Sequence, residues 1–212
     1  DVFSFPLGKD YTNCVYPIVN SLELLHTLCK SGVSMIQLRI KDNFGQNLDK
    51  DISLACEIVS KFPRTKFFIN DHWELAIKHD AFGIHLGQED ILKADMKKIS
   101  KSGLHLGIST HSYWEVGRAL RYGPSYVACG PIFPTRVKKM PWKSQGLNNL
   151  TFWSKILNFP VIAIGGIKHS NIDVVAKTGC QGVSLINAIN DSKDPVKSFK
   201  ALSNIWGKNN LR

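Results

Sequence analysis

Eight short apolar runs alternate with eight amphipathic stretches along the 212 residues of the chain, and this alternation predicts a single (β/α)8 TIM barrel over residues 1–212. The short runs are apolar on both faces, as buried parallel strands are. The alternative is an open doubly wound sheet, which usually carries a glycine-rich fingerprint after its first strand. Only Asn20 and Ser21 follow the first run here, so the closed barrel is favoured.

The predicted strands lie at residues 14–19, 35–39, 66–70, 83–86, 105–109, 126–129, 161–164 and 182–185. Between and after them, helical spacing covers residues 22–30, 49–62, 73–79, 91–100, 112–122, 150–157, 172–177 and 196–206. In the second helix, for example, Ile52, Ala55 and Val59 recur near the 3.6-residue period that lines one helical face. These units fill the chain and leave no room for a second domain.

The chain carries a net charge of +10, from 27 Lys and Arg against 17 Asp and Glu. Excess positive charge suits anionic partners, which include nucleic acids and phosphorylated metabolites. The basic residues are spread along the chain rather than gathered with aromatic residues on one face, as nucleic-acid binders often gather them. We therefore predict small-molecule phosphates as partners and no nucleic acid. A non-catalytic nucleic-acid or scaffold protein is the competing hypothesis from a different class.

Five scattered cysteines, none of them in a C-x-x-C pair, argue against a disulfide framework and against a zinc site. They favour a reducing, cytoplasmic location. No apolar run approaches the ~18 residues of a membrane span, so no membrane partner is predicted.

Polar residues stand where five of the predicted strands end, which in a barrel is the mouth of the active site. Each has a structural alternative. Arg39 and Lys41 could form ion pairs on a rim, Asp71 and Asp90 could cap helices, and a strand histidine such as His85 could be a packed or hydrogen-bonded barrel residue. Their coincidence at neighbouring strand ends favours a site over these separate explanations.

The chemistry of this set points to a diphosphate. Asp71 and Asp90 offer the oxygen ligands that Mg²⁺ prefers, and Mg²⁺ typically takes one or two carboxylates together with water and phosphate. Arg39, Lys41 and Lys138 supply positive charge that would stabilise a departing diphosphate. The predicted site thus has a metal and cationic side chains but no evident general base. This combination favours a reaction that loses a diphosphate over one that abstracts a proton.

A second anion site is predicted after the last two strands. Gly165 and Gly166 follow the seventh strand, and Ile186 and Asn187 follow the eighth. In this fold the corresponding loops, with their main-chain N–H groups and a helix N-terminus, commonly hold a phosphate. A bare turn is the alternative for the glycine pair.

Taken together, the motifs resemble the thiamine-phosphate synthase family over nearly the whole chain. The family joins a hydroxymethylpyrimidine diphosphate to a thiazole phosphate, or its carboxylated form, and releases pyrophosphate. An H-x-G-Q-x-D stretch at residues 85–90 and a G-P-I-F-P-T loop at residues 130–135 are the most specific motifs of this resemblance. With the other matching segments, the resemblance covers residues 37–41, 69–71, 83–90, 107–109, 130–135, 145–146 and 160–167.

The resemblance implies a role for each matching residue, with a Mg²⁺ cofactor. Asp71 and Asp90 match the magnesium ligands. Substrate contacts are implied for Gln37, Leu38, Arg39, Ile40, Lys41, Asn70, Ser109 and Lys138 on the pyrimidine diphosphate, and for Thr135, Arg136, Val137, Gly166, Ile186 and Asn187 on the thiazole phosphate. Among these, the resemblance makes Arg39, Lys41, Ser109 and Lys138 catalytic.

The chain departs from the family pattern at two positions. Val137 stands where the family commonly has Thr, which removes a hydroxyl from the thiazole-phosphate site, and Asn187 stands where Ser is frequent. A thiazole tautomerase-like enzyme, or another phosphate-binding isomerase on this barrel, is the nearest alternative. It generally lacks the complete metal and diphosphate set, which favours the synthase. A homo-oligomer stays open.

Overall fold

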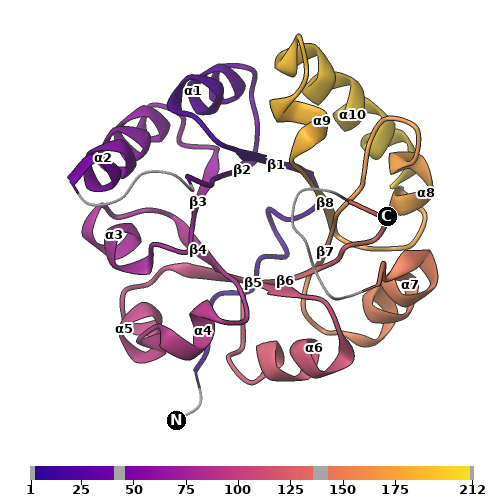
Figure 1. Cartoon of the computed structure of the whole chain (residues 1–212), viewed down its shortest axis with the longest axis horizontal. Helices are drawn as coiled ribbons and strands as arrows, with labels where there is room; N and C mark the ends of the chain where they lie inside the picture. The colour runs from indigo at the N-terminus through magenta and orange to yellow at the C-terminus, as the bar shows by residue number, and fades with distance from the viewer. Residues whose placement is uncertain (1–2, 41–45, 136–142, 211–212) are drawn as a thin grey trace.

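In the computed structural model, eight parallel strands close into a barrel in the order β1 to β8, and helices surround it (Figure 1). The structure describes residues 3–40, 46–135 and 143–210. The strands are β1 (Val15–Val19), β2 (Met35–Leu38), β3 (Lys66–Asn70), β4 (Gly83–Leu86), β5 (His105–Thr110), β6 (Tyr126–Cys129), β7 (Val161–Ile164) and β8 (Gly182–Leu185). The predicted TIM barrel is therefore confirmed.

The helices cover the outside of this barrel (Figure 1). They are α1 (Leu22–Lys30), α2 (Gln46–Ser60), α3 (Trp73–Lys78), α4 (Asp90–Lys93), α5 (Met96–Lys101), α6 (Tyr113–Leu120), α7 (Gly146–Ile156), α8 (Ile172–Ala176), α9 (Asn187–Asn190) and α10 (Pro195–Asn209). The prediction missed two features: α9 was not expected, and α2 and α7 both begin earlier than their periodic residues indicate.

One predicted helix, over residues 91–100, is in fact two. Ala94 leaves the helical region with φ −73° and ψ 145°, which ends α4. Asp95 then accepts a hydrogen bond from the Lys98 N–H at 3.0 Å and starts α5 as its N-cap. A strong capping residue inside an apolar period thus divided the helix.

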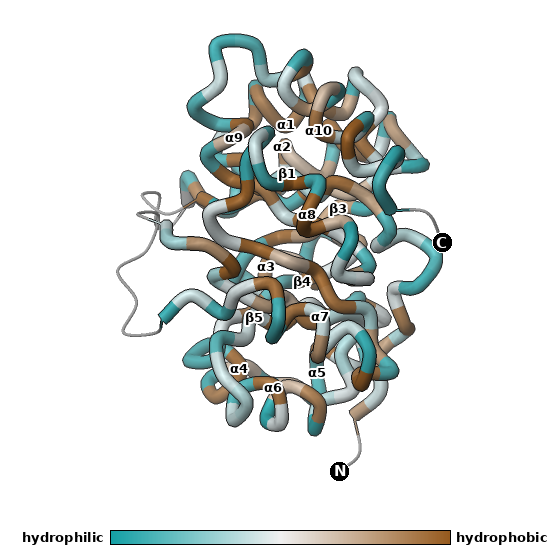
Figure 2. The backbone as a smooth tube through the Cα atoms, turned by 90° about the vertical axis from the view of Figure 1, so that its right-hand side faces the viewer, coloured by the Kyte–Doolittle hydropathy of each residue, from teal (hydrophilic) through white to brown (hydrophobic). Residues whose placement is uncertain are grey.

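The outer face of the sheet packs against the apolar faces of the helices. In α1, for example, Ser21 caps the Leu24 N–H at 3.2 Å, and Leu25 and Leu28 are completely buried. Truncating either leucine to Ala would cost about 2–5 kcal/mol of stability. Apolar segments run through the strands and hydrophilic residues gather in the turns at the periphery (Figure 2). Within the described part of the chain, no helix is both long and apolar enough to cross a membrane.

Side chains fill the barrel interior from the N-terminal ends of the strands, its lower end, up to the middle. A buried cluster occupies the middle, and it consists of Tyr16, Met35, Phe68, Tyr126, Ala128 and Ile162. Below it, the segment before β1 crosses the N-terminal end of the barrel, where the Gly8 N–H donates to the Ser125 carbonyl at 2.9 Å and Tyr11 packs edge-on against Phe82. In the described part of the chain, the barrel is open toward the carboxyl ends of the strands, where residues from several strand ends line a cavity.

Candidate active site

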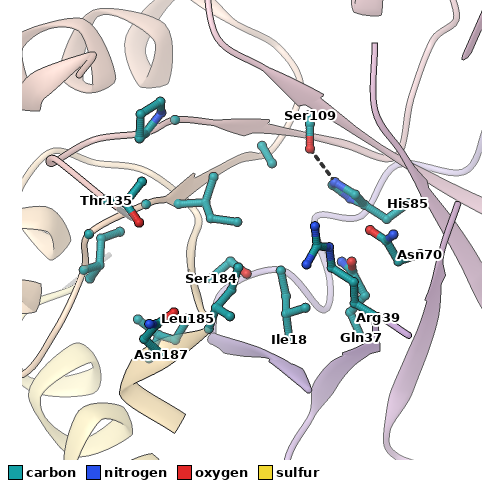
Figure 3. A pocket seen from close by; sticks show the side chains of 18 of the residues that line it. Ile18, Gln37, Arg39, Asn70, His85, Ser109, Thr135, Ser184, Leu185 and Asn187 are labelled. Carbon is teal, nitrogen blue, oxygen red and sulfur yellow. Dashed lines mark hydrogen bonds between the residues drawn. The ribbon is translucent and has the colours of Figure 1, made fainter. Parts of the chain in front are cut away.

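A cavity opens at the carboxyl ends of the strands (Figure 3). It encloses about 930 Å³ of empty space, counting its open mouth. Strand ends and loops from both halves of the barrel line it. It therefore lies where enzymes of this fold carry out their chemistry.

One wall of the cavity is built from polar side chains at the ends of β2, β3 and β5. Gln37, Arg39, Asn70 and Ser109 all line it, and all four are labelled in Figure 3. Alternation along a strand explains why residues 37 and 39 both point inward.

The same alternation turns two predicted contact residues outward. Leu38 belongs to the apolar cluster that includes helix residues, and Ile40 packs against it. Neither side chain lines the cavity. Substrate contact by Leu38 and Ile40 remains a prediction for their main-chain groups alone.

Arg39 is a partly buried cation at this wall. Burial lowers the pKa of its guanidinium, and the neighbouring Asp71 carboxylate opposes that shift. An arginine stays protonated in proteins in spite of such shifts. The cavity therefore holds a fixed positive charge, directed at whatever anion enters.

Asp71 and Asp90 lie close enough to influence each other at the ends of β3 and β4. Burial raises the pKa of Asp71 and the Asp90 carboxylate raises it further, while His72, Arg39 and a hydrogen bond from Asn70 oppose the shift. Asp71 has φ +66°, an uncommon conformation for a residue with a side chain. Its N–H donates to the His85 carbonyl at 2.9 Å, which fixes it beside β4.

The helix-cap alternative is wrong for Asp71. The N-cap of α3 is His72, which makes no side-chain capping bond. Asp90 is the first residue of α4, and its Oδ2 accepts from the Gly87 N–H at 3.2 Å, so this carboxylate has a local structural partner. Neither carboxylate lines the cavity itself.

The two carboxylates fit a magnesium ion and do not fit a metal that needs more protein ligands. Among the described residues there is no group of three or more His, Cys, Asp or Glu side chains that could hold a metal. Mg²⁺ accepts one or two carboxylates and completes its octahedron with water and substrate phosphate.

The opposite wall includes two consecutive glycines. Gly165 and Gly166 follow β7 with φ +99° and +67°, in the left-handed region that favours glycine. A Cβ on Gly166 would lie 2.7 Å from both the Phe133 Cβ and the Pro134 carbonyl oxygen. The Phe133 N–H also donates to the Gly165 carbonyl at 3.0 Å. This glycine pair is thus more than a bare turn, because it permits a close approach of two loops.

Four of the residues predicted to hold the thiazole phosphate line this part of the cavity: Thr135, Gly166, Ile186 and Asn187. Ile186 and Asn187 lie where β8 passes into α9. Asn190 holds this turn in place, because its Nδ2 donates to the Ile18 carbonyl at 2.7 Å and to the Ile186 carbonyl at 2.8 Å.

Four further predicted site residues, Lys41, Arg136, Val137 and Lys138, lie outside the described residues. The predicted contacts of these residues, including the consequence of valine at position 137, stay predictions.

His85 is a site residue whose role the sequence did not show. Its Nε2 lies 2.7 Å from the Ser109 hydroxyl and its Nδ1 lies 2.8 Å from the Tyr126 hydroxyl (Figure 3 shows the Ser109 contact). Burial, followed by Arg39 and His111, lowers the pKa of His85 to about 4. The imidazole is therefore neutral at pH 7. A usable signal was its inward register beside Gly107, the neighbour that leaves room for the ring.

His111 is a second residue that sequence analysis did not single out. It lines the cavity, and its Nδ1 contacts the Glu115 carboxylate at 2.7 Å. The same carboxylate accepts the His111 main-chain N–H at 2.6 Å, and Gln145 donates to the His111 carbonyl at 2.5 Å. The spacing of four residues between His111 and Glu115 was the available signal.

These features together define a TIM-barrel enzyme with a polar, cationic cavity at the carboxyl ends of its strands and a glycine loop after β7. Enzymes of this fold frequently bind a phosphate with the loops that follow their seventh and eighth strands.

Comparison with known proteins narrows this class to one family. The family described as "Thiamine monophosphate synthase" matches residues 14–189, and the chain belongs to it. A protein named thiamine-phosphate synthase from Proteus mirabilis is 48% identical over 196 residues, which cover 92% of this chain and 91% of that protein. Its namesake from Salmonella typhimurium is 42% identical over 181 residues, or 85% of each.

A solved structure supports the same assignment. The thiamine phosphate pyrophosphorylase from Pyrococcus furiosus superposes with a TM-score of 0.82 and 26% identity, covering 95% of this chain and 97% of that one. A 3-hexulose-6-phosphate synthase, at a TM-score of 0.64 and 18% identity, shares the fold alone.

Proposed function

We propose that the chain is a thiamine-phosphate synthase, which joins 4-amino-2-methyl-5-hydroxymethylpyrimidine diphosphate to 4-methyl-5-(2-phosphoethyl)thiazole and releases pyrophosphate. With the carboxylated form of the thiazole, CO2 would be released as well. The observation that supports this proposal is that the polar wall and the glycine wall face a single cavity. The polar residues of β2, β3 and β5 and the glycine loop after β7 line the same space. A single cavity with two chemically different walls suits two substrates that react with each other.

Mg²⁺ is part of the proposal, with Asp71 and Asp90 as its protein ligands. The like charges of these carboxylates favour a divalent cation between or beside them. When bound, Mg²⁺ would neutralise charge on the diphosphate and favour its departure.

The chain's own residues would then act by position and charge. Arg39, together with Lys41 and Lys138, would hold the diphosphate and stabilise it as it leaves with the electron pair of the broken C–O bond. Gln37, Asn70 and Ser109 would orient the pyrimidine, whose ring shares the positive charge that develops on its methylene carbon. The thiazole nitrogen would donate its lone pair to that carbon and form the new C–N bond.

The second wall would fix the nucleophile. Main-chain groups around Gly166, with Ile186 and Asn187, would bind the phosphate of the thiazole and present its nitrogen to the methylene carbon. Holding two reactants in line in this way supplies much of a catalytic effect without any covalent contribution from the protein.

The direct test is to incubate the purified protein with both substrates and Mg²⁺ and to measure thiamine phosphate and pyrophosphate. We expect both products in a 1:1 ratio and no turnover when Mg²⁺ is removed by a chelator. The isomerase alternative predicts conversion of the thiazole without the pyrimidine and without pyrophosphate. The nucleic-acid alternative predicts salt-sensitive binding of RNA or DNA and no products.

We also propose that the partners are these small molecules and that the location is the reducing cytoplasm. Five free cysteine thiols support the latter, because such thiols persist where disulfides are kept reduced. The number of subunits stays open.

A further inference from the structure

A chain of hydrogen bonds runs through the barrel interior and connects two residues of the cavity wall. The Gln37 Nε2 donates to the Tyr16 hydroxyl at 2.8 Å, and the Tyr16 and Tyr126 hydroxyls are 3.0 Å apart. The Tyr126 hydroxyl lies 2.8 Å from the His85 Nδ1, and the His85 Nε2 lies 2.7 Å from the Ser109 hydroxyl. Gln37 and Ser109, the two ends of the chain, both line the cavity.

Each middle member of this chain has one proton to give. Burial raises the pKa of Tyr16 and of Tyr126 far above neutrality, so both phenols keep their protons. A His85 ring nitrogen that accepts a hydrogen bond carries no proton, so the imidazole proton is then on the other ring nitrogen. A series of groups that each donate once and accept once must run in a single direction.

The Gln37 amide sets that direction. Because its Nε2 donates to Tyr16, Tyr16 donates to Tyr126, and Tyr126 donates to the His85 Nδ1. The proton of His85 is then on Nε2 and is donated to the Ser109 oxygen. At one end of the chain, this direction leaves the Ser109 hydroxyl proton free to be donated to a ligand. At the other end is the buried Gln37 Oε1, which has no hydrogen-bond partner in the described part of the chain.

The packing around the chain is specific for it. Gly107 lies on β5 directly beside His85 on β4. A Cβ at position 107 would lie 2.7 Å from the His85 Nδ1 and would overlap the Tyr126 ring. Glycine at this position thus makes room for the contact between Tyr126 and His85.

We propose that Tyr16, Tyr126 and His85 are positioning residues, which fix Gln37 as a hydrogen-bond acceptor and Ser109 as a hydrogen-bond donor toward the cavity. An acceptor at Gln37 matches an amino group on a ligand, and a donor at Ser109 matches an unprotonated ring nitrogen. The aminopyrimidine is an aromatic ring that has both groups. The inference rests on the proposed function, since the pyrimidine diphosphate is the ligand concerned.

The protein contains a matched control for this chain. The Tyr11 hydroxyl contacts the His105 Nδ1 at 2.8 Å at the opposite end of the barrel, and Tyr11 packs against the same Phe68 that contacts Tyr126. Neither Tyr11 nor His105 lines the cavity. Tyr11→Phe therefore removes an equivalent tyrosine–histidine bond without touching the proposed chain.

The test is to compare Tyr126→Phe with Tyr11→Phe by calorimetry, using two ligands in the presence of Mg²⁺: the pyrimidine diphosphate and inorganic pyrophosphate. We expect Tyr126→Phe to weaken the pyrimidine diphosphate by about fivefold to tenfold, the effect of one lost hydrogen bond, and to leave pyrophosphate unchanged. Tyr11→Phe should change neither. Equal losses for both ligands, equal losses in both variants, or no loss in Tyr126→Phe would each overturn the inference.

Two further measurements keep the test independent of folding defects. Tyr16→Phe breaks the same chain at another point, and the double variant with Tyr126→Phe should lose no more affinity than the weaker-binding single variant. In ¹⁵N NMR spectra of the free wild-type protein, His85 should carry its proton on Nε2, and a proton on Nδ1 would overturn the assigned direction.

The two proposals fail in distinguishable ways. A wild-type protein that makes thiamine phosphate while Tyr126→Phe and Tyr16→Phe bind pyrimidine diphosphate normally would overturn the positioning inference alone. A wild-type protein that neither binds the pyrimidine diphosphate nor forms product would overturn both.

Discussion

The two walls of the cavity are built from different parts of the polypeptide. On the β2 to β5 side, the lining groups are side chains, which are connected by hydrogen bonds and include the charged Arg39. On the β7 side, the wall includes Gly165 and Gly166, whose backbone has the left-handed conformation that favours glycine. The first wall therefore depends on the identity and protonation of individual side chains. The second depends on the path of the backbone.

The largest effect should come from the carboxylates beside the side-chain wall. The double variant Asp71→Asn, Asp90→Asn keeps side-chain size but removes both charges, and we expect kcat to fall by at least about 10³-fold because the leaving diphosphate loses its metal. Steady-state rates over a Mg²⁺ titration check this. Turnover close to the wild-type rate would contradict the metal assignment.

The side-chain wall should also be sensitive to acid. The pKa of His85 is lowered from 6.5 to about 4 in the folded protein, so the unfolded chain binds a proton first as the pH falls. The stability that this provides is complete above pH 6.5 and is lost as the pH falls from 6.5 to about 4, by up to about 3 kcal/mol.

His85→Gln should lack this part of the acid dependence, which urea unfolding curves between pH 7 and pH 4 would show. His26→Gln, on the outer helix α1, is the control. If the free energy of unfolding of His85→Gln falls with acid as steeply as that of the wild type, the assignment of His85 as a neutral buried histidine is wrong.

The main-chain wall should respond to a single methyl group. Gly166→Ala places a Cβ against Phe133 and Pro134 at a left-handed φ, and strain of this kind typically costs about 1–3 kcal/mol. We expect the KM for the thiazole phosphate to rise by about 10-fold to 100-fold, with little change in the KM for the pyrimidine diphosphate.

Gly32→Ala is the matched control for this variant. Gly32 also has a left-handed φ, of +88°, but a Cβ there would meet nothing within 4 Å. Both variants should lose stability, and only Gly166→Ala should change KM. If Gly166→Ala changed the KM for both substrates equally, the assignment of one substrate to each wall would be contradicted.

The smallest effect should come from a side chain on the main-chain wall. Asn187→Ser restores the residue that is frequent in the family, and we expect the KM for the thiazole phosphate to change by less than about threefold, because we propose main-chain donors as the principal contacts there. A tenfold change would mean that the Asn187 side chain itself binds the phosphate.

The sequence predicted the barrel well because strand periodicity and helix periodicity are local signals. Five of the eight strands have the predicted bounds, and the inward positions 37 and 39 followed from alternation alone. One error occurred where a local signal competed with the period, at Asp95, whose capping bond divides a predicted helix.

The side-chain wall was only partly predictable for a different reason. Strand ends identified Gln37, Asn70 and Ser109, since position on a strand decides which residues reach the mouth. The connection from Gln37 to Ser109 through two tyrosines and His85 could not be predicted, because it joins five strands that are far apart in the sequence. The contribution of His111 likewise depends on a contact with Glu115 that a sequence pattern suggests only weakly.

The segment before β1 has a consequence for the route by which ligands reach the cavity. Tyr11 and the buried cluster in the middle of the barrel fill the interior on the N-terminal side of the cavity. Among the described residues, the cavity is therefore open toward the carboxyl ends of the strands. Both substrates and both products of the proposed reaction would pass through this opening.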